Sequence, residues 1–233
     1  MVAIASFLMC ASSRARAADR YLIDGAVLHA SSSLPQTLVD GVNPQGWLLY
    51  TQSYGVRDAI CEVFLAKTVA SQHASADKLP YNVLKPGAFV GIIHLLPEAT
   101  EDYSADFHNQ QLRPGYYTMR YAVMPSGTYE HGTKLGEFLV LAAANMDRDP
   151  AQILKPGELA HLGAAASGNE VAASMELVAP DRSQRTSPVA KADETGMCIF
   201  QVQLRLTPAK GRPPKELALA IAMLNPLHGP EGS

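Results

Sequence analysis

The sequence has little tryptophan, little cysteine and no strong excess of either charge. One Trp and three Cys occur in 233 residues, and 19 Lys and Arg oppose 22 Asp and Glu. A chain without a basic stripe has no electrostatic basis for binding nucleic acid. None of its apolar runs reaches the roughly 18 residues that a membrane-spanning helix needs. We therefore expect neither a nucleic-acid partner nor a transmembrane span.

The sequence motifs of the common enzyme classes are also missing. The chain contains no nucleophile elbow, His-Glu-x-x-His, Cys-x-x-Cys pair, P-loop or dinucleotide fingerprint. These absences favour a protein without catalytic activity, but they leave room for an enzyme whose site is built from scattered residues.

The N-terminus has the pattern of an export signal. Residues 1–11 (MVAIASFLMCA) have the length of a signal-peptide h-region, and Ala-Arg-Ala at 15–17 fits a small-x-small cleavage site. A signal peptide over 1–17 would place the protein in the periplasm or outside the cell. It would leave one domain over 18–225 and a flexible tail over 226–233. The alternative for the first residues is a buried strand or helix.

Two cysteines, Cys61 and Cys198, would remain after cleavage. In an oxidising compartment two such thiols can form a disulfide. Two separate buried thiols are the equally good alternative, because the sequence does not reveal the distance between the two residues.

Apolar segments with period two predict a β protein. Residues 198–206 alternate between apolar and mostly polar side chains, and a proline-rich link joins them to the apolar residues 216–224, which predicts a hairpin with a long loop. Further strands are predicted at 21–30, 46–52, 59–69, 88–96, 116–124, 137–144 and 174–178, with a helix as the alternative for 59–69. Residues 156–167 predict a helix, and the polar residues 179–196 an exposed loop. This spacing indicates an all-β fold, an immunoglobulin-like or jelly-roll-type β-sandwich with one or two short helices.

A Leu-basic-Pro-Gly sequence occurs three times, beginning at Leu84, Leu112 and Leu154. Pro-Gly is typical of a type II turn, because Pro fixes φ at the second position and Gly accepts the positive φ at the third. The copies have no fixed period and lack the further glycines of a phosphate-binding loop. We interpret them as turns that start strands or helices rather than as ligand-binding loops.

The second copy also carries a family resemblance. Residues 112–123 (LRPGYYTMRYAV) resemble the Leu-x-Pro-Gly-x-Tyr-x-apolar-Arg stretch of bacterial extracytoplasmic immunoglobulin-like β-sandwich modules. Residues 106–149 are similar to secreted proteins of environmental bacteria with no assigned activity. The resemblance implies a secreted β-sandwich and no particular chemistry.

Three histidines form the best candidate metal site. His94 ends a predicted strand, and His108 and His131 lie in loops that could meet at one end of the sheet, with Glu130 beside them. Imidazoles with one carboxylate suit Zn or Cu. Solvated loop histidines and a hydrogen-bonded core His94 are the alternative.

Alternating acidic and amide residues at Asn145, Asp147 and Asp149 resemble the start of a calcium loop. The EF-hand pattern needs Gly at its sixth position and Glu at its twelfth, where this chain has Pro150 and Pro156. The pattern therefore predicts a solvated turn.

Aromatic residues supply the candidate ligand site, at Trp47, Tyr116, Tyr117 and Tyr129. They can stack against a glycan, a small molecule or an envelope protein, although core packing is the alternative role for most of them. Tyr116 and Tyr117 must point to opposite faces of their strand. The sequence thus favours an exported binding module, with a metal-binding protein or metal-dependent enzyme as the alternative.

Overall fold

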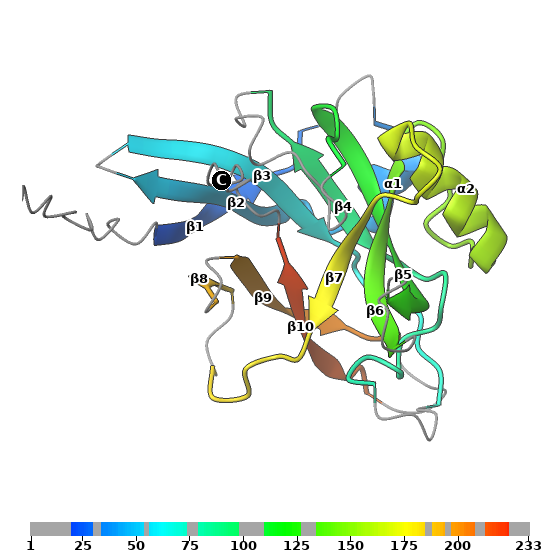
Figure 1. Ribbon diagram of the computed structural model, residues 1–233. Coiled ribbons are helices and arrows are strands. Elements are labelled where there is room, and N and C mark those ends of the chain that lie inside the picture. Colours follow the sequence, from blue (N-terminus) through cyan, green and yellow to red (C-terminus); the bar gives the residue numbers. More distant parts are fainter. Residues whose placement is uncertain are drawn as a thin grey trace, which may run out of the picture.

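The computed structural model describes residues 20–29, 34–53, 56–73, 79–97, 110–126, 134–184, 188–193, 197–207 and 213–223. These residues form strands β1 (Arg20–Val27), β2 (Gln45–Ser53), β3 (Val56–Leu65), β4 (Phe89–Leu95), β5 (Gly115–Ser126), β6 (Lys134–Ala143), β7 (Ser174–Val178), β8 (Val189–Ala192), β9 (Cys198–Arg205) and β10 (Glu216–Ala222). Two helices, α1 (Gln36–Gly41) and α2 (Pro156–Ser167), complete the described part of the chain (Figure 1).

All ten strands join in one antiparallel sheet, in the order β1-β2-β3-β4-β5-β6-β7-β10-β9-β8. Strand β8 at one end of this order lies beside β1 at the other. The sheet is therefore nearly closed into a barrel. The all-β prediction is confirmed, but the immunoglobulin-like or jelly-roll sandwich is not, because the described strands form one sheet rather than two packed ones.

The interior of the barrel is identified by a contact between two rings on strands that do not pair with each other. Trp47 of β2 lies 5.9 Å from Phe200 of β9, measured between ring centroids. Residues paired directly across an antiparallel sheet share a face, and Trp47 pairs with Val63, Val63 with Ile93, and Ile93 with Tyr117. These side chains therefore point inward, where they join the largest apolar cluster.

A network of buried hydrogen bonds spans this interior. The backbone N–H of Tyr81 donates to Glu137 Oε1 at 2.9 Å, and the hydroxyl of Tyr121 donates to the same oxygen at 2.7 Å. The Tyr81 hydroxyl donates in turn to the carbonyl of Val178 and accepts from the N–H of Ala220. Burial raises the pKa of Glu137, against the lowering effect of these two donors. These hydrogen bonds connect the segment before β4 to strands β6, β7 and β10.

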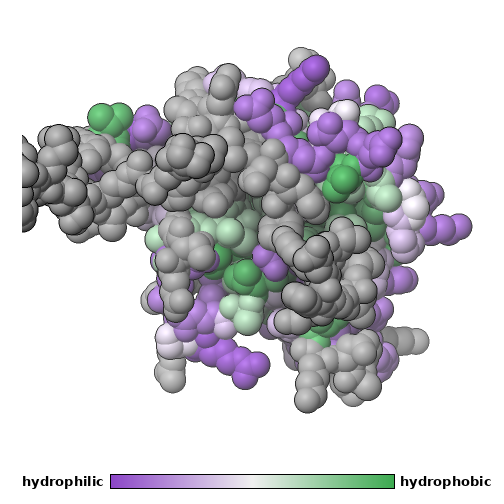
Figure 2. Space-filling model, in the orientation of Figure 1, coloured by the Kyte–Doolittle hydropathy of each residue, from purple (hydrophilic) through white to green (hydrophobic). Residues whose placement is uncertain are grey.

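Helix α2 covers the outer face of β5 and β6. Its Leu159 packs with Val140 and Leu154 in a separate apolar cluster. An ideal Cβ at Gly163 would lie 2.9 Å from Val140 Cγ1, so this position must be small for the helix to approach the strand. Hydrophilic side chains predominate on the solvent side of this region, at the right of the molecule (Figure 2). The prediction of a helix over residues 156–167 is confirmed.

The strand predictions are confirmed for nine segments, and two elements were missed. Residues 179–196, expected to be an exposed loop, contain β8, and α1 was not predicted. Residues 1–17 and 226–233, the expected signal peptide and tail, lie outside the described residues. Within the described ranges, no helix is long and apolar enough to cross a membrane.

The three Leu-basic-Pro-Gly copies each precede a strand or begin a helix, as predicted. In the first copy the N–H of Ala88 donates to the carbonyl of Lys85 at 3.0 Å and Gly87 has φ of 84°, which is the geometry of a type II turn. The second copy begins β5, and the third begins α2 with Pro156 in its first turn.

Candidate functional site

A polar row crosses the outer face of the barrel on β3, β4 and β5. His94 pairs directly with Glu62 on one side and with Tyr116 on the other. Its Nδ1 lies 2.8 Å from Glu62 Oε2, and its ring stacks on the Tyr116 ring at a centroid distance of 3.9 Å and an interplanar angle of 10°. The sheet register therefore brings together a carboxylate, an imidazole and a phenol (the polar row).

The chemistry of the polar row follows from its hydrogen bond. An ionised carboxylate can only accept, so Nδ1 of His94 is the donor in this bond, and Nε2 has a lone pair whenever the ring is neutral. The side chains of His94 and Glu62 are 19% and 22% exposed, so the pair is partly shielded from water. Burial, with a smaller contribution from the Glu62 charge, raises the pKa of Tyr116. The tyrosine is thus held neutral and stacked.

A groove of about 680 Å³ lies beside Tyr116. Strand β5 lies between β4 and β6, so the His94 ring is on the β4 side of Tyr116. On the β6 side, the N–H of Ala144, which directly follows β6, donates to the carbonyl of Tyr116. The small side chains of Ala143 and Ala144 leave room there. The lining residues are Leu34, Pro35, Pro114, Gly115, Tyr116, Tyr117, Ala143, Ala144, Asn145 and Arg148.

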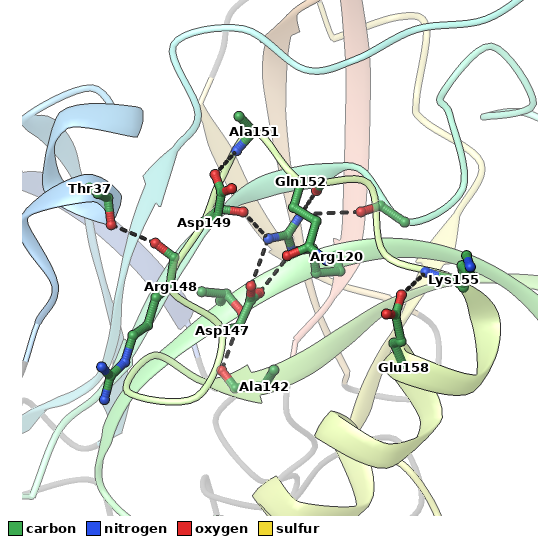
Figure 3. A network of polar contacts seen from close by, with 12 residues as sticks. Thr37, Arg120, Ala142, Asp147, Arg148, Asp149, Ala151, Gln152, Lys155 and Glu158 are labelled. Atoms are coloured by element: carbon green, nitrogen blue, oxygen red, sulfur yellow. Dashed lines mark hydrogen bonds and ion pairs between the residues drawn. The ribbon is translucent and has the colours of Figure 1, made fainter.

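One wall of the groove, the segment 145–149, is held from below by a buried ion pair (Figure 3). Arg120 is fully buried, and its Nε and Nη2 donate to the two carboxylate oxygens of Asp147 at 2.8 and 2.7 Å. Thr118 donates to the same carboxylate. Arg120 also donates to the carbonyl groups of Asp149, Gln152 and Gly87. Every polar group of this pair has a partner, so its role is structural.

This ion pair corrects the prediction of a solvated turn at residues 145–149. Asp147 is 4% exposed and its oxygens are used by Arg120 and Thr118. The alternation of acidic residues was visible in the sequence, but the cation that one of them binds is on β5, far away in the chain.

Arg148 projects from the same wall in the opposite direction. Its Nε donates to the carbonyl of Asn145 at 2.6 Å, and its own carbonyl accepts from the hydroxyl of Thr37 on α1. In Figure 3 its guanidinium points away from Arg120 and Asp147. The wall therefore combines a fixed backbone with an exposed cation.

The predicted ligand-binding aromatics do not form one platform. Tyr116 and Tyr117 both line the groove, but Tyr117 is buried and its hydroxyl donates to the carbonyl of Arg113 at 2.7 Å. Trp47 points inward against Phe200 and lines a different hollow, near β1. Tyr129 lies outside the described residues. The aromatic hypothesis is thus reduced to Tyr116.

The predicted metal site falls mostly outside the described part of the chain. His108, Glu130 and His131 are not described, so their meeting with His94 stays a prediction. No group of three or more metal-ligating side chains exists within the ranges that the structure covers. His94, offered as either a ligand or a core residue, is half-buried and bound to Glu62.

Cys61 and Cys198 are both buried free thiols in the structure. Burial raises the pKa of each thiol, and the Cys198 charge adds to the rise at Cys61. Both thiols are free in the structure, and a disulfide between them stays a prediction.

Three contributors to the site were missed in the sequence: Glu62, Arg120 and Arg148. Glu62 carried a usable signal, because it is the one acidic residue in the apolar run 59–66. An isolated charge in an otherwise buried strand needs a partner. Arg148 had no local signal of this kind.

Comparison with protein-family models, curated proteins and solved structures found no match to this chain.

Proposed function

We propose that this protein is an exported, non-catalytic β-barrel module that binds a glycan in the groove beside Tyr116. The observation that carries the proposal is the Tyr116 ring, which is stacked by His94 on one side and borders an open groove with small residues on the other. The N-terminal export pattern supports a location in the periplasm or outside the cell.

The chemistry of the groove suits a sugar ring. An aromatic face is electron-rich and attracts the weakly positive C–H groups on one face of a pyranose. Stacking on His94 fixes the Tyr116 ring in advance, so binding loses little side-chain entropy. Asn145 and Arg148 supply hydrogen-bond donors at the rim, and ligand sites are typically apolar surfaces with a few placed polar groups.

A glycan-binding screen with three variants tests this proposal. Tyr116→Ala removes the stacking face and should weaken binding at least about tenfold, or ~1.4 kcal/mol. Tyr116→Phe keeps the ring and should bind nearly as well as the wild type. Tyr50→Ala, which removes a partly exposed tyrosine of β2 outside the groove lining, is the matched control. Equal affinities for wild type and Tyr116→Ala would overturn the proposal.

The polar row favours a second candidate, a metal-binding protein or a metal-dependent enzyme. A histidine whose Nδ1 donates to a carboxylate presents Nε2 as a ligand, and such carboxylate partners are common at Zn sites. The site would take Zn or Cu, with His108 and His131 as further ligands. Elemental mass spectrometry of protein purified without chelator or His-tag tests it. Near-stoichiometric metal, lost in His94→Ala, would support this candidate, and metal-free folded protein would exclude it.

A further inference from the structure

Arg148 is the one charged residue among the ten residues that line the groove. Its side chain is exposed, and its Nε bond to the carbonyl of Asn145 fixes the direction of the guanidinium. Within the described part of the chain, no hydrogen bond or ion pair engages its two Nη groups, so they are available to a ligand.

The acidic side chains near Arg148 are already engaged elsewhere. Asp147 is neutralised by Arg120 beneath the wall. Asp149 turns its carboxylate to the N–H of Ala151, on the other side of the chain from the Arg148 guanidinium (Figure 3). Arg148 is therefore the charged side chain that the described lining residues present to the groove.

From this arrangement we infer that the groove selects acidic sugars, with Arg148 as the residue that binds the carboxylate of a uronic acid. The inference rests on the glycan-binding function proposed above and names its substrate class. A guanidinium matches a carboxylate through two parallel N–H···O bonds, which add direction as well as charge. Tyr116 would bind the sugar ring while Arg148 binds its carboxylate or that of the next residue in the chain.

A pair of probes that differ only in charge tests this inference. Oligogalacturonate and oligomannuronate are compared by calorimetry with their own fully methyl-esterified forms, which keep the sugar rings and remove the negative charge. We expect the acidic form of at least one to bind tenfold or more tighter than its ester. The preference should shrink at 0.5 M salt, where exposed charges are screened beyond about 4–5 Å.

Two substitutions of Arg148 assign the preference to this residue. Arg148→Gln should reduce the acid-to-ester ratio to near one, because it weakens binding of the acid far more than binding of the ester. Arg148→Lys keeps the charge but loses the paired hydrogen bonds, so it should keep only part of the ratio. The exposed side chain makes no buried contact, and circular dichroism checks that both variants fold as the wild type does.

The outcomes separate this inference from the proposed function. If the esters bind as tightly as the acids, or if Arg148→Gln keeps the preference, the inference is wrong while glycan binding stands. If neither acidic, esterified nor neutral oligosaccharides bind, both are wrong.

Discussion

The sharpest test of the fold concerns the buried ion pair beneath the groove. Arg120→Met replaces the guanidinium by an apolar side chain of similar length. It leaves the Asp147 carboxylate, 4% exposed, with Thr118 as its remaining side-chain donor, and it removes the donor from three backbone carbonyl groups. Removing one partner of a buried ion pair costs about 3–5 kcal/mol. The free energy of unfolding should fall by that amount.

Urea denaturation measures this loss. With a slope of about 2 kcal/mol per molar urea, the midpoint should fall by about 2 M. Arg57→Met is the matched control, because the Arg57 to Asp24 pair is 3.8 Å long and both side chains are more than half exposed. Such a pair contributes less than about 1 kcal/mol. If the two variants lost similar amounts of stability, the structural role given to Arg120 would be refuted.

A double variant distinguishes the charge from the packing. In Arg120→Met with Asp147→Leu, no unpaired buried charge remains, so part of the stability should return. The recovery should be incomplete, since the carbonyl groups of Gly87, Asp149 and Gln152 still lack their donor. Full recovery would mean that these three hydrogen bonds contribute nothing.

Three further predictions concern the interior and the turns. Because burial raises the pKa of Glu137, the folded state binds its proton more tightly than the unfolded chain; stability should fall as pH rises from 4.5 through the folded pKa, and Glu137→Gln should flatten this decline in urea midpoints. Gly87→Ala should cost about 2 kcal/mol or more in the same assay, because φ is 84° and an added Cβ would clash with the carbonyl oxygen of Leu154; a loss under 0.5 kcal/mol would contradict the turn. Cys61 and Cys198 should react with a thiol reagent only after unfolding without reductant, whereas a disulfide would give no reaction at either residue.

Local pattern was enough to predict nine strands and the long helix, because alternation and turn residues act over a few positions. The closure of the sheet could not be predicted from such local patterns. It depends on β7 pairing with β10 and on β8 lying beside β1, and these contacts join segments far apart in sequence. Strand β8 (Val-Ala-Lys-Ala) has only four residues, none of them buried, so it is too short to show an alternating pattern. Helix α1 buries only Leu38.

The sequence predicted the residue types of the candidate site but not their arrangement, because the arrangement depends on contacts between strands. His94 and Tyr116 were chosen for their side-chain chemistry, and both belong to the site. Their stacking and the role of Glu62 depend on the register of β3, β4 and β5. A shift of one residue in this register would move each side chain of the shifted strand to the other face of the sheet. The inward direction of Trp47 and the burial of Tyr117 follow from the same register.

The repeated Leu-basic-Pro-Gly turns show how structural turns can still determine a binding surface. The first and third copies meet, since the N–H of Leu154 donates to the carbonyl of Gly87 at 3.3 Å, and Arg120 binds that same carbonyl. The second copy places Pro114 and Gly115 in the lining of the groove, immediately before Tyr116. None of these turns binds a ligand in our proposal. They fix the strand that carries Tyr116 and the ion pair that holds the wall with Arg148, so a substitution in the first turn should weaken glycan binding as well as stability.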